Sequence, residues 1–208
     1  MSASRLQLST QVRTLSLWAR YLLLLDRRPL VTKAVTSGVL KLFATLTSQT
    51  IKGVEEIDWV QVKQYVFFAV FLDLPVSEPW YSRGLSLLSN GLGLHAMQKR
   101  QPQLAKLIEA AADQFTFGVF HTAYFFVMTG LIEGQGLCHS WRIMLERLLP
   151  TTKESLVFWI PVGYLTLNLR PSLQILGFQA WGTIWAGWLA YRQKSHQDRH
   201  KIEDKKKV

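Results

Sequence analysis

Four long apolar stretches dominate the pattern of hydrophobic and polar positions along this chain. They cover residues 30–51, 60–76, 115–132 and 172–191, and each holds between 17 and 22 residues. About 20 apolar residues in a helix are enough to cross the hydrocarbon core of a bilayer. The pattern therefore predicts an all-α, polytopic membrane helix bundle with four spans, occupying residues 30–191.

Three weaker segments lie between these stretches. A fifth apolar run, residues 155–169, is short and contains Pro161, which favours a broken, re-entrant or interfacial helix. Residues 81–98 alternate Leu with Ser, Gly and Asn. They fit either an amphipathic helix at the membrane surface or an extension of the second span. A short polar helix is expected over residues 103–113.

The composition supports this interpretation. Of the 208 residues, 49% are hydrophobic, 12% are aromatic and only 18% are charged, and the mean hydropathy is +0.10. These values exclude a disordered chain and a coiled coil. One cysteine, Cys138, excludes an intramolecular disulfide and a cysteine-only metal site. A soluble α protein with a large core and a small membrane protein remain.

The positive charge gathers at the two ends of the chain. Residues 1–33 carry six basic residues against one acid, and residues 192–208 carry seven against three, so the ends supply +9 of the net charge of +10. Basic flanks favour one side of a membrane, which places both termini on the same side and requires an even number of crossings. We expect a basic amphipathic segment at 1–29, a basic tail at 192–208, and no nucleic-acid partner.

The beginning of the chain is rich in Arg, Ser and Thr and has no acid in its first 25 residues. This composition is typical of a mitochondrial presequence. An uncleaved amphipathic segment that leads into the first span fits it equally well.

Several polar side chains interrupt the apolar stretches. In the first stretch they recur about every four residues and so share one helix face: Lys33, Ser37, Lys41, Thr45 and Ser48, with Gln49 beside them. Polar groups within a membrane usually face the bundle interior, water or a partner. The stripe predicts either a lining for anionic metabolites or ordinary helix–helix contacts. The candidate pore-lining residues are Lys41, Thr45, Gln49, Asp73, His121 and Arg170.

Catalytic and cofactor motifs are missing from the sequence. The segment Asn90–His95 holds a Gly-x-Gly without a third glycine or a preceding strand, so it is no nucleotide fingerprint. Histidines and acids do not recur at metal-ligand spacing, and Cys138 and His139 have no visible orienting group. We expect no catalytic residue, no metal and no cofactor, and hence a protein that is not an enzyme.

A series of landmarks occurs in order along residues 18–190. The first segment holds Pro29, Thr32 and Gly38, and Asp113 and Gln114 open the third apolar stretch. Further landmarks lie around the second and last stretches: Pro75, Trp80, Tyr81, Trp159, Pro161, Asn168, Pro171 and Trp185. Their order and spacing together resemble the Mpv-seventeen / 22-kDa peroxisomal membrane protein family.

Several positions depart from the family pattern, among them Ala44 and Leu74 in place of glycines and the missing arginine after Pro171. Thr45 stands where the family's Gly-Asp-x3-Gln motif has Asp, although Gln49 is kept. Glu78 stands where Gly-Pro-x2-His-x-Trp-Tyr has His, and Ala186 replaces the Asn of the closing motif. The chain therefore resembles a divergent member.

The resemblance implies an integral protein of the mitochondrial inner membrane or, alternatively, of the peroxisomal membrane. It implies a channel-like function for small metabolites, with the lipid bilayer as surroundings. The motif losses favour a second hypothesis, an accessory structural subunit of a respiratory-chain or ATP-synthase membrane complex. Other subunits or copies of this chain are the expected protein partners.

Overall fold

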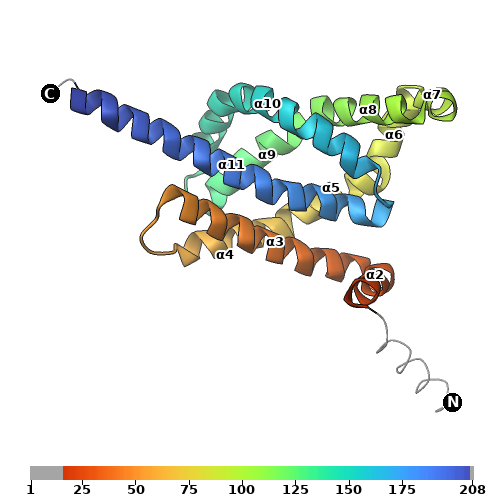
Figure 1. Ribbon diagram of the computed structural model, residues 1–208, viewed down its shortest axis with the longest axis horizontal. Coiled ribbons are helices and arrows are strands. Elements are labelled where there is room, and N and C mark those ends of the chain that lie inside the picture. Colours follow the sequence, from red (N-terminus) through yellow and green to blue (C-terminus); the bar gives the residue numbers. More distant parts are fainter. Residues whose placement is uncertain (1–15, 207–208) are drawn as a thin grey trace, which may run out of the picture.

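Helices make up nearly all of the chain that the computed structural model describes, residues 16–206 (Figure 1). A short helix, α2 (Leu17–Arg27), precedes five rods. Each rod begins close to where the previous rod ends, so consecutive rods run in opposite directions. The rods are α3 (Pro29–Lys52); α4 (Trp59–Phe67) to α6 (Leu85–Gly91); α8 (Pro102–Asp113) to α9 (Val119–Ile132); α10 (Leu137–Leu167); and α11 (Pro171–Lys206).

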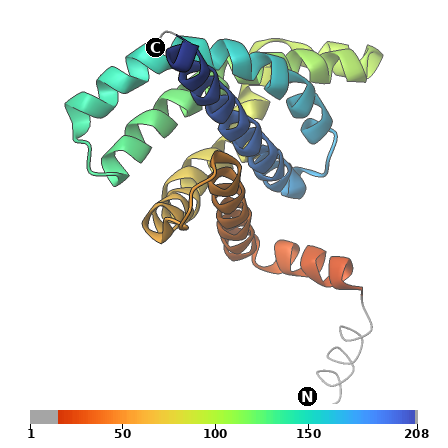
Figure 2. The same ribbon diagram turned by 60° about the vertical axis from the view of Figure 1, so that its left-hand side comes forward.

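The first and last rods lie side by side and run in the same direction (Figures 1 and 2). The Ser37 hydroxyl donates to Gln179 Oε1 over 2.5 Å, and further along both helices the Ser48 hydroxyl donates to the Ala186 carbonyl over 3.3 Å. Parallel first and last rods place the start of α3 and the end of α11 at opposite ends of the bundle. Residues 1–15 of the basic segment expected at 1–29 lie outside the described residues, and over the described chain this arrangement differs from the expectation that both ends lie on one side.

The fifth apolar run, 155–169, is not a broken helix. It forms the second half of α10, which is continuous through Pro150 and Pro161. This helix returns along the whole third rod: the Tyr164 hydroxyl reaches Gln103 over 2.8 Å near one end, and Gly130 packs against Ser140 near the other. The charged residues before residue 155 belong to the same helix, so α10 forms a rod of its own.

The second and third rods widen at three places. Each contains π-helical turns: η1 (Phe68–Asp73) and η2 (Trp80–Gly84), separated by α5 (Leu74–Pro79), in the second rod, and η3 (Gln114–Gly118) in the third. The second rod continues to Gly91, so the extension of the second span is confirmed, with a separate α7 (Leu94–Arg100) after it. Helix α8 confirms the polar helix expected at 103–113, although it leads into η3 without a break.

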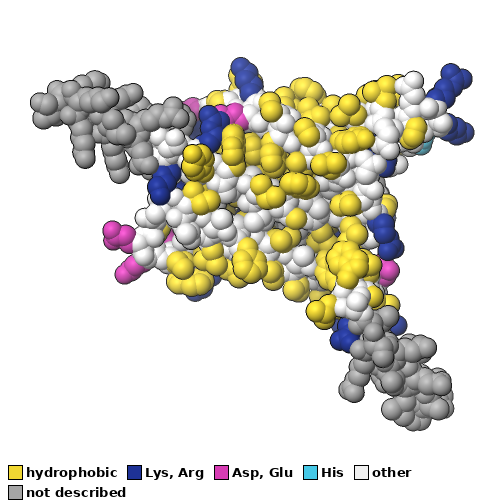
Figure 3. All heavy atoms as spheres, in the orientation of Figure 1, with side chains coloured by type: hydrophobic (Ala, Val, Ile, Leu, Met, Phe, Trp, Pro, Cys, Tyr) yellow, Lys and Arg dark blue, Asp and Glu magenta, His cyan; other side chains and the backbone are white. Residues whose placement is uncertain are grey.

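Apolar side chains cover much of the outer surface (Figure 3). Two helices of the described chain are long and apolar enough to cross a membrane, Pro29–Lys52 and Pro102–Ile132, and only 22% and 17% of their most apolar windows are buried inside the protein. The core helix of a soluble protein would be mostly buried. The outward apolar face suits lipid, and the all-α membrane bundle predicted from the sequence is confirmed.

Candidate functional site

Three of the predicted lining residues come together inside the bundle. Lys41 lies on α3, Asp73 at the end of η1, and His121 on α9. His121 Nε2 lies 2.6 Å from Asp73 Oδ1, and the Ser77 hydroxyl donates to the same oxygen over 3.0 Å. Lys41 and Asp73 also interact electrostatically. Side chains from three rods thus form one charged cluster within apolar surroundings.

The Lys41 ammonium lies over three aromatic rings. Its Nζ is 5.4 Å from the ring centre of Tyr65, 5.8 Å from that of Phe68 and 5.3 Å from that of Phe125. A cation within about 6 Å of a ring face is attracted by the ring quadrupole. The rings therefore stabilise a charge that apolar side chains alone would disfavour, and they also cover it.

A separate charged pair involves Lys33, which lies before Lys41 on α3. Lys33 Nζ donates to both carboxylate oxygens of Glu78, at 2.8 and 2.7 Å. The Lys33 side chain is 8% exposed and that of Glu78 is 22% exposed. Glu78 is the position at which the family motif has His, so the departure from the motif supplies the carboxylate for Lys33.

Asp113 anchors the aromatic residues of the second rod. Its carboxylate is almost fully buried, and it accepts from Trp80 Nε1 over 2.7 Å and from the Gln114 side chain over 3.0 Å. The Trp80 ring stacks on Phe117 with 4.9 Å between ring centres. Tyr81, the next residue, meets Phe117 edge-on at 5.7 Å. These family-motif residues join η2 to η3.

The other three candidate lining residues lie elsewhere. Thr45 is buried and donates to the Lys41 carbonyl over 2.9 Å. Gln49 closes the loop between α3 and α4, since it accepts from the Asp58 amide over 2.9 Å and donates to the Asp58 carbonyl over 3.1 Å. Arg170 is exposed in the turn between α10 and α11. The charged cluster includes none of their side chains.

The remaining family-motif positions are mostly packing or helix-end sites. Pro29 and Pro171 begin α3 and α11. A Cβ on Gly38 would lie 3.3 Å from the Val70 side chain, so the first two rods approach closely there. Trp159 and Trp185 meet at 6.2 Å between α10 and α11.

Further motif residues hold helix ends and turns. Thr32 bonds back to the Leu24 carbonyl over 3.1 Å and so ties α3 to α2. Asn168 ends α10 and accepts from Lys106 over 2.9 Å. Pro75 lies in the first turn of α5, and Pro161 lies within α10.

The sequence interpretation missed two features of this site. It placed Lys33 in the polar stripe but did not pair it with Glu78, and it did not foresee the rings over Lys41. The spacing of the stripe indicated the buried face of α3, whereas the partners come from other rods.

No group of three or more His, Cys, Asp or Glu able to hold a metal occurs among the described residues.

Comparison with known proteins places the chain among small membrane proteins. It is 24% identical over 198 residues to "PXMP2/4 family protein 2" of Dictyostelium discoideum, covering 90% of this chain and 97% of that protein. It is 22% identical over 180 residues to "Peroxisomal membrane protein 2" of Bos taurus, covering 83% and 87%. It is also 24% identical over 105 residues to "Protein SYM1" of Yarrowia lipolytica, covering 50% and 52%.

No family model matches the chain, and no solved structure matches it significantly. The similarity to the slime-mould protein nevertheless extends over nearly the full length of both chains at low identity. The sequence motifs and these relatives point to the same group of proteins. The resemblance predicted from the sequence is confirmed: this chain is similar, at low identity, to membrane proteins of the Mpv-seventeen / 22-kDa peroxisomal membrane protein family.

Proposed function

We propose that this protein is a non-enzymatic, channel-like protein that passes small anionic metabolites across an organelle membrane. The observation that carries the proposal is the grouping of Lys41, Asp73 and His121, from three rods, within the bundle. Charged groups within membrane-spanning segments are costly and often mark a solute or ion pathway. Lys41 supplies the positive charge that an anion requires.

The rings of Tyr65 and Phe125 cover Lys41 in the arrangement described here. Passage of a solute past Lys41 therefore requires these rings to move apart. Removing one of them opens the route. Phe125→Ala is expected to raise flux, and Lys41→Met is expected to lower the flux of anions more than that of neutral solutes of equal size.

The test is flux through purified protein reconstituted into vesicles, with a known pore protein as positive control. Wild-type protein is compared with Lys41→Met and with Lys63→Met, a control on α4 outside the charged cluster. Anion flux that falls in Lys41→Met alone supports the proposal. Absence of flux in wild type and in Phe125→Ala, while the control pore conducts, refutes it.

A second candidate function, an accessory structural subunit of a mitochondrial membrane complex, is favoured by α11. That helix continues to Lys206 and projects past the rods (Figure 1). Its residue Lys194 already lies beside Gly53, the residue after the end of α3. A projecting helix offers a surface to another subunit or another copy of this chain. Native-gel separation of gently solubilised membranes tests this: comigration with a large complex favours it.

We place the protein in the mitochondrial inner membrane on the basis of its Arg- and Ser-rich, acid-free start. The name of the bovine relative supports the alternative, the peroxisomal membrane. Imaging of the full chain with a tag at its C-terminus, beside markers of both organelles, distinguishes the two locations.

A further inference from the structure

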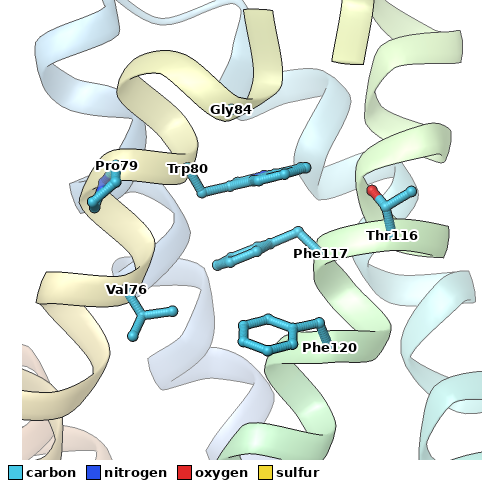
Figure 4. Close-up of a pocket in the computed structure, with 7 residues that line it drawn as sticks. All are labelled: Val76, Pro79, Trp80, Gly84, Thr116, Phe117 and Phe120. Atoms are coloured by element: carbon cyan, nitrogen blue, oxygen red, sulfur yellow. The ribbon is translucent and has the colours of Figure 1, made fainter. Parts of the chain in front are cut away.

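An open pocket of about 480 Å³ lies between the second and third rods (Figure 4). Its walls come from α5 and η2 on one side and from η3 and α9 on the other, and they carry no charged side chain: Val76, Pro79, Trp80, Gly84, Thr116, Phe117 and Phe120. The volume is within the range of small-molecule sites, roughly 300–1,000 Å³.

The polar groups of the wall already have partners. The Trp80 N–H donates to Asp113 over 2.7 Å, so the indole offers its ring to the pocket. The Thr116 hydroxyl donates to the Ala112 carbonyl over 2.8 Å. A ligand that needs hydrogen bonds therefore finds little here, while an apolar ligand leaves no buried polar group without a partner.

Contacts among neighbouring rings hold the aromatic side chains of the pocket in place. Trp80 stacks on Phe117 at 4.9 Å, and Phe117 also meets Tyr81 at 5.7 Å and Phe120 at 6.0 Å. The absence of a side chain on Gly84 leaves room for the Trp80 ring, since a Cβ there would lie 2.5 Å from it. The shape is thus formed in advance, which reduces the entropy lost on binding.

The position of the pocket identifies its surroundings. Phe117 belongs to the membrane-span candidate Pro102–Ile132 and is the third residue of its apolar stretch 115–132, so the pocket lies toward one end of that stretch, near the beginning of the hydrocarbon layer. Phe120, which lines the pocket, is 53% exposed. The pocket is therefore continuous with the surface that faces lipid.

We infer that this pocket binds one acyl chain of a membrane phospholipid. The open side lets a chain enter sideways while its headgroup stays at the membrane surface. A sterol fits less well, because its hydroxyl would lie at this depth beside no free hydrogen-bond partner. The bound chain touches Phe117, whose ring centre is 5.5 Å from that of His121. The Phe117 side chain therefore lies between the bound lipid and the charged cluster.

The test is photo-crosslinking in vesicles whose phosphatidylcholine carries a photoactivatable group near the middle of one acyl chain. Purified full-length protein is irradiated, and labelled residues are mapped by mass spectrometry. Labelling concentrated on Trp80, Phe117 and Phe120 is the expected result. Labelling no denser there than at Phe43, an exposed ring on α3, overturns the inference, as does preferential labelling by a photoactivatable sterol.

A filling variant and a matched control make the test specific. Val76→Phe places a ring in the pocket, whereas Val39→Phe adds the same ring to an outward-facing position on α3. Labelling of Phe117 should fall about fivefold or more in Val76→Phe, a change of roughly 1 kcal/mol in binding, and stay unchanged in Val39→Phe. Equal labelling in both variants overturns the inference. The wild-type map decides the question even if Val76→Phe folds poorly, and none of these readouts depends on flux.

Discussion

The ion pair between Lys33 and Glu78 allows a quantitative test of the bundle interior. Both carboxylate oxygens accept from one ammonium at 2.7–2.8 Å, and both side chains are largely shielded from solvent. Removing one partner of a buried pair costs about 3–5 kcal/mol because the other charge stays buried without compensation. Glu78 retains some exposure, so we expect about 2 kcal/mol for either Lys33→Met or Glu78→Gln.

The double variant distinguishes a true pair from two independent sites. Replacing both charges removes the desolvation penalty together with the attraction, so the double variant should lose less than about 1 kcal/mol. The coupling energy is then about 3 kcal/mol, which is at the upper end for residues in contact. Glu78→His, the residue of the family motif, leaves Lys33 without a carboxylate and should destabilise as Glu78→Gln does.

The measurement is reversible denaturation in detergent micelles, followed by tryptophan fluorescence, for the four proteins of the cycle. Glu154→Gln is the control. Its carboxylate pairs with Arg192 at 2.6 Å, but the two side chains are 41% and 38% exposed, and an exposed pair contributes at most about 1 kcal/mol. A double variant that loses the sum of the two single losses would refute the pairing.

Three further predictions concern the rods and their connections. Trp80→Phe keeps an aromatic ring but removes the N–H that donates to Asp113. It should lower the unfolding free energy by about 1–3 kcal/mol, measured in the same denaturation assay. Gln49→Leu removes the bonds that close the loop after α3, and hydrogen exchange of that loop should quicken by at least about tenfold, equivalent to about 1.4 kcal/mol. Gly38→Leu forces apart rods that approach closely and should cost about 1–3 kcal/mol, whereas Gly91→Ala, with open space around it, should change thermal stability little.

The apolar periodicity was sufficient to predict the helices but not the number of passes. Every long apolar stretch is helical in the structure, because the local pattern determines both the helix and its outward face. The fifth rod was missed because charged residues interrupt the first half of α10, which therefore has no long apolar run. Glu146, Arg147 and Lys153 nevertheless favour helices, and the Glu154–Arg192 pair joins this part of α10 to α11.

The charged cluster was predictable only in part, for a related reason. Lys33, Ser37 and Lys41 recur at helical spacing, so their common face on α3 could be inferred from the sequence. Their partners lie on other rods, 45 residues away for the Lys33–Glu78 pair and 142 for Ser37 and Gln179, and a single sequence does not encode such pairings locally. Glu78 was for this reason interpreted as the loss of a motif residue rather than as the gain of a partner.

Two departures from the family motif that change an acid or a histidine, Thr45 and Glu78, each lie near a lysine of α3. Thr45 replaces an acid, and it lies one turn from Lys41 on the buried face of α3, where its hydroxyl bonds to the Lys41 carbonyl. Glu78 replaces a histidine and adds an acid beside Lys33. The number of acids at these two motif positions is therefore the same as in the family pattern, but the acid has moved from the Lys41 end of the stripe to the Lys33 end. Lys41 is left with the aromatic rings and the more distant Asp73, and among the described residues its ammonium makes no ion pair of the kind that Lys33 makes with Glu78, which is consistent with the anion route proposed above.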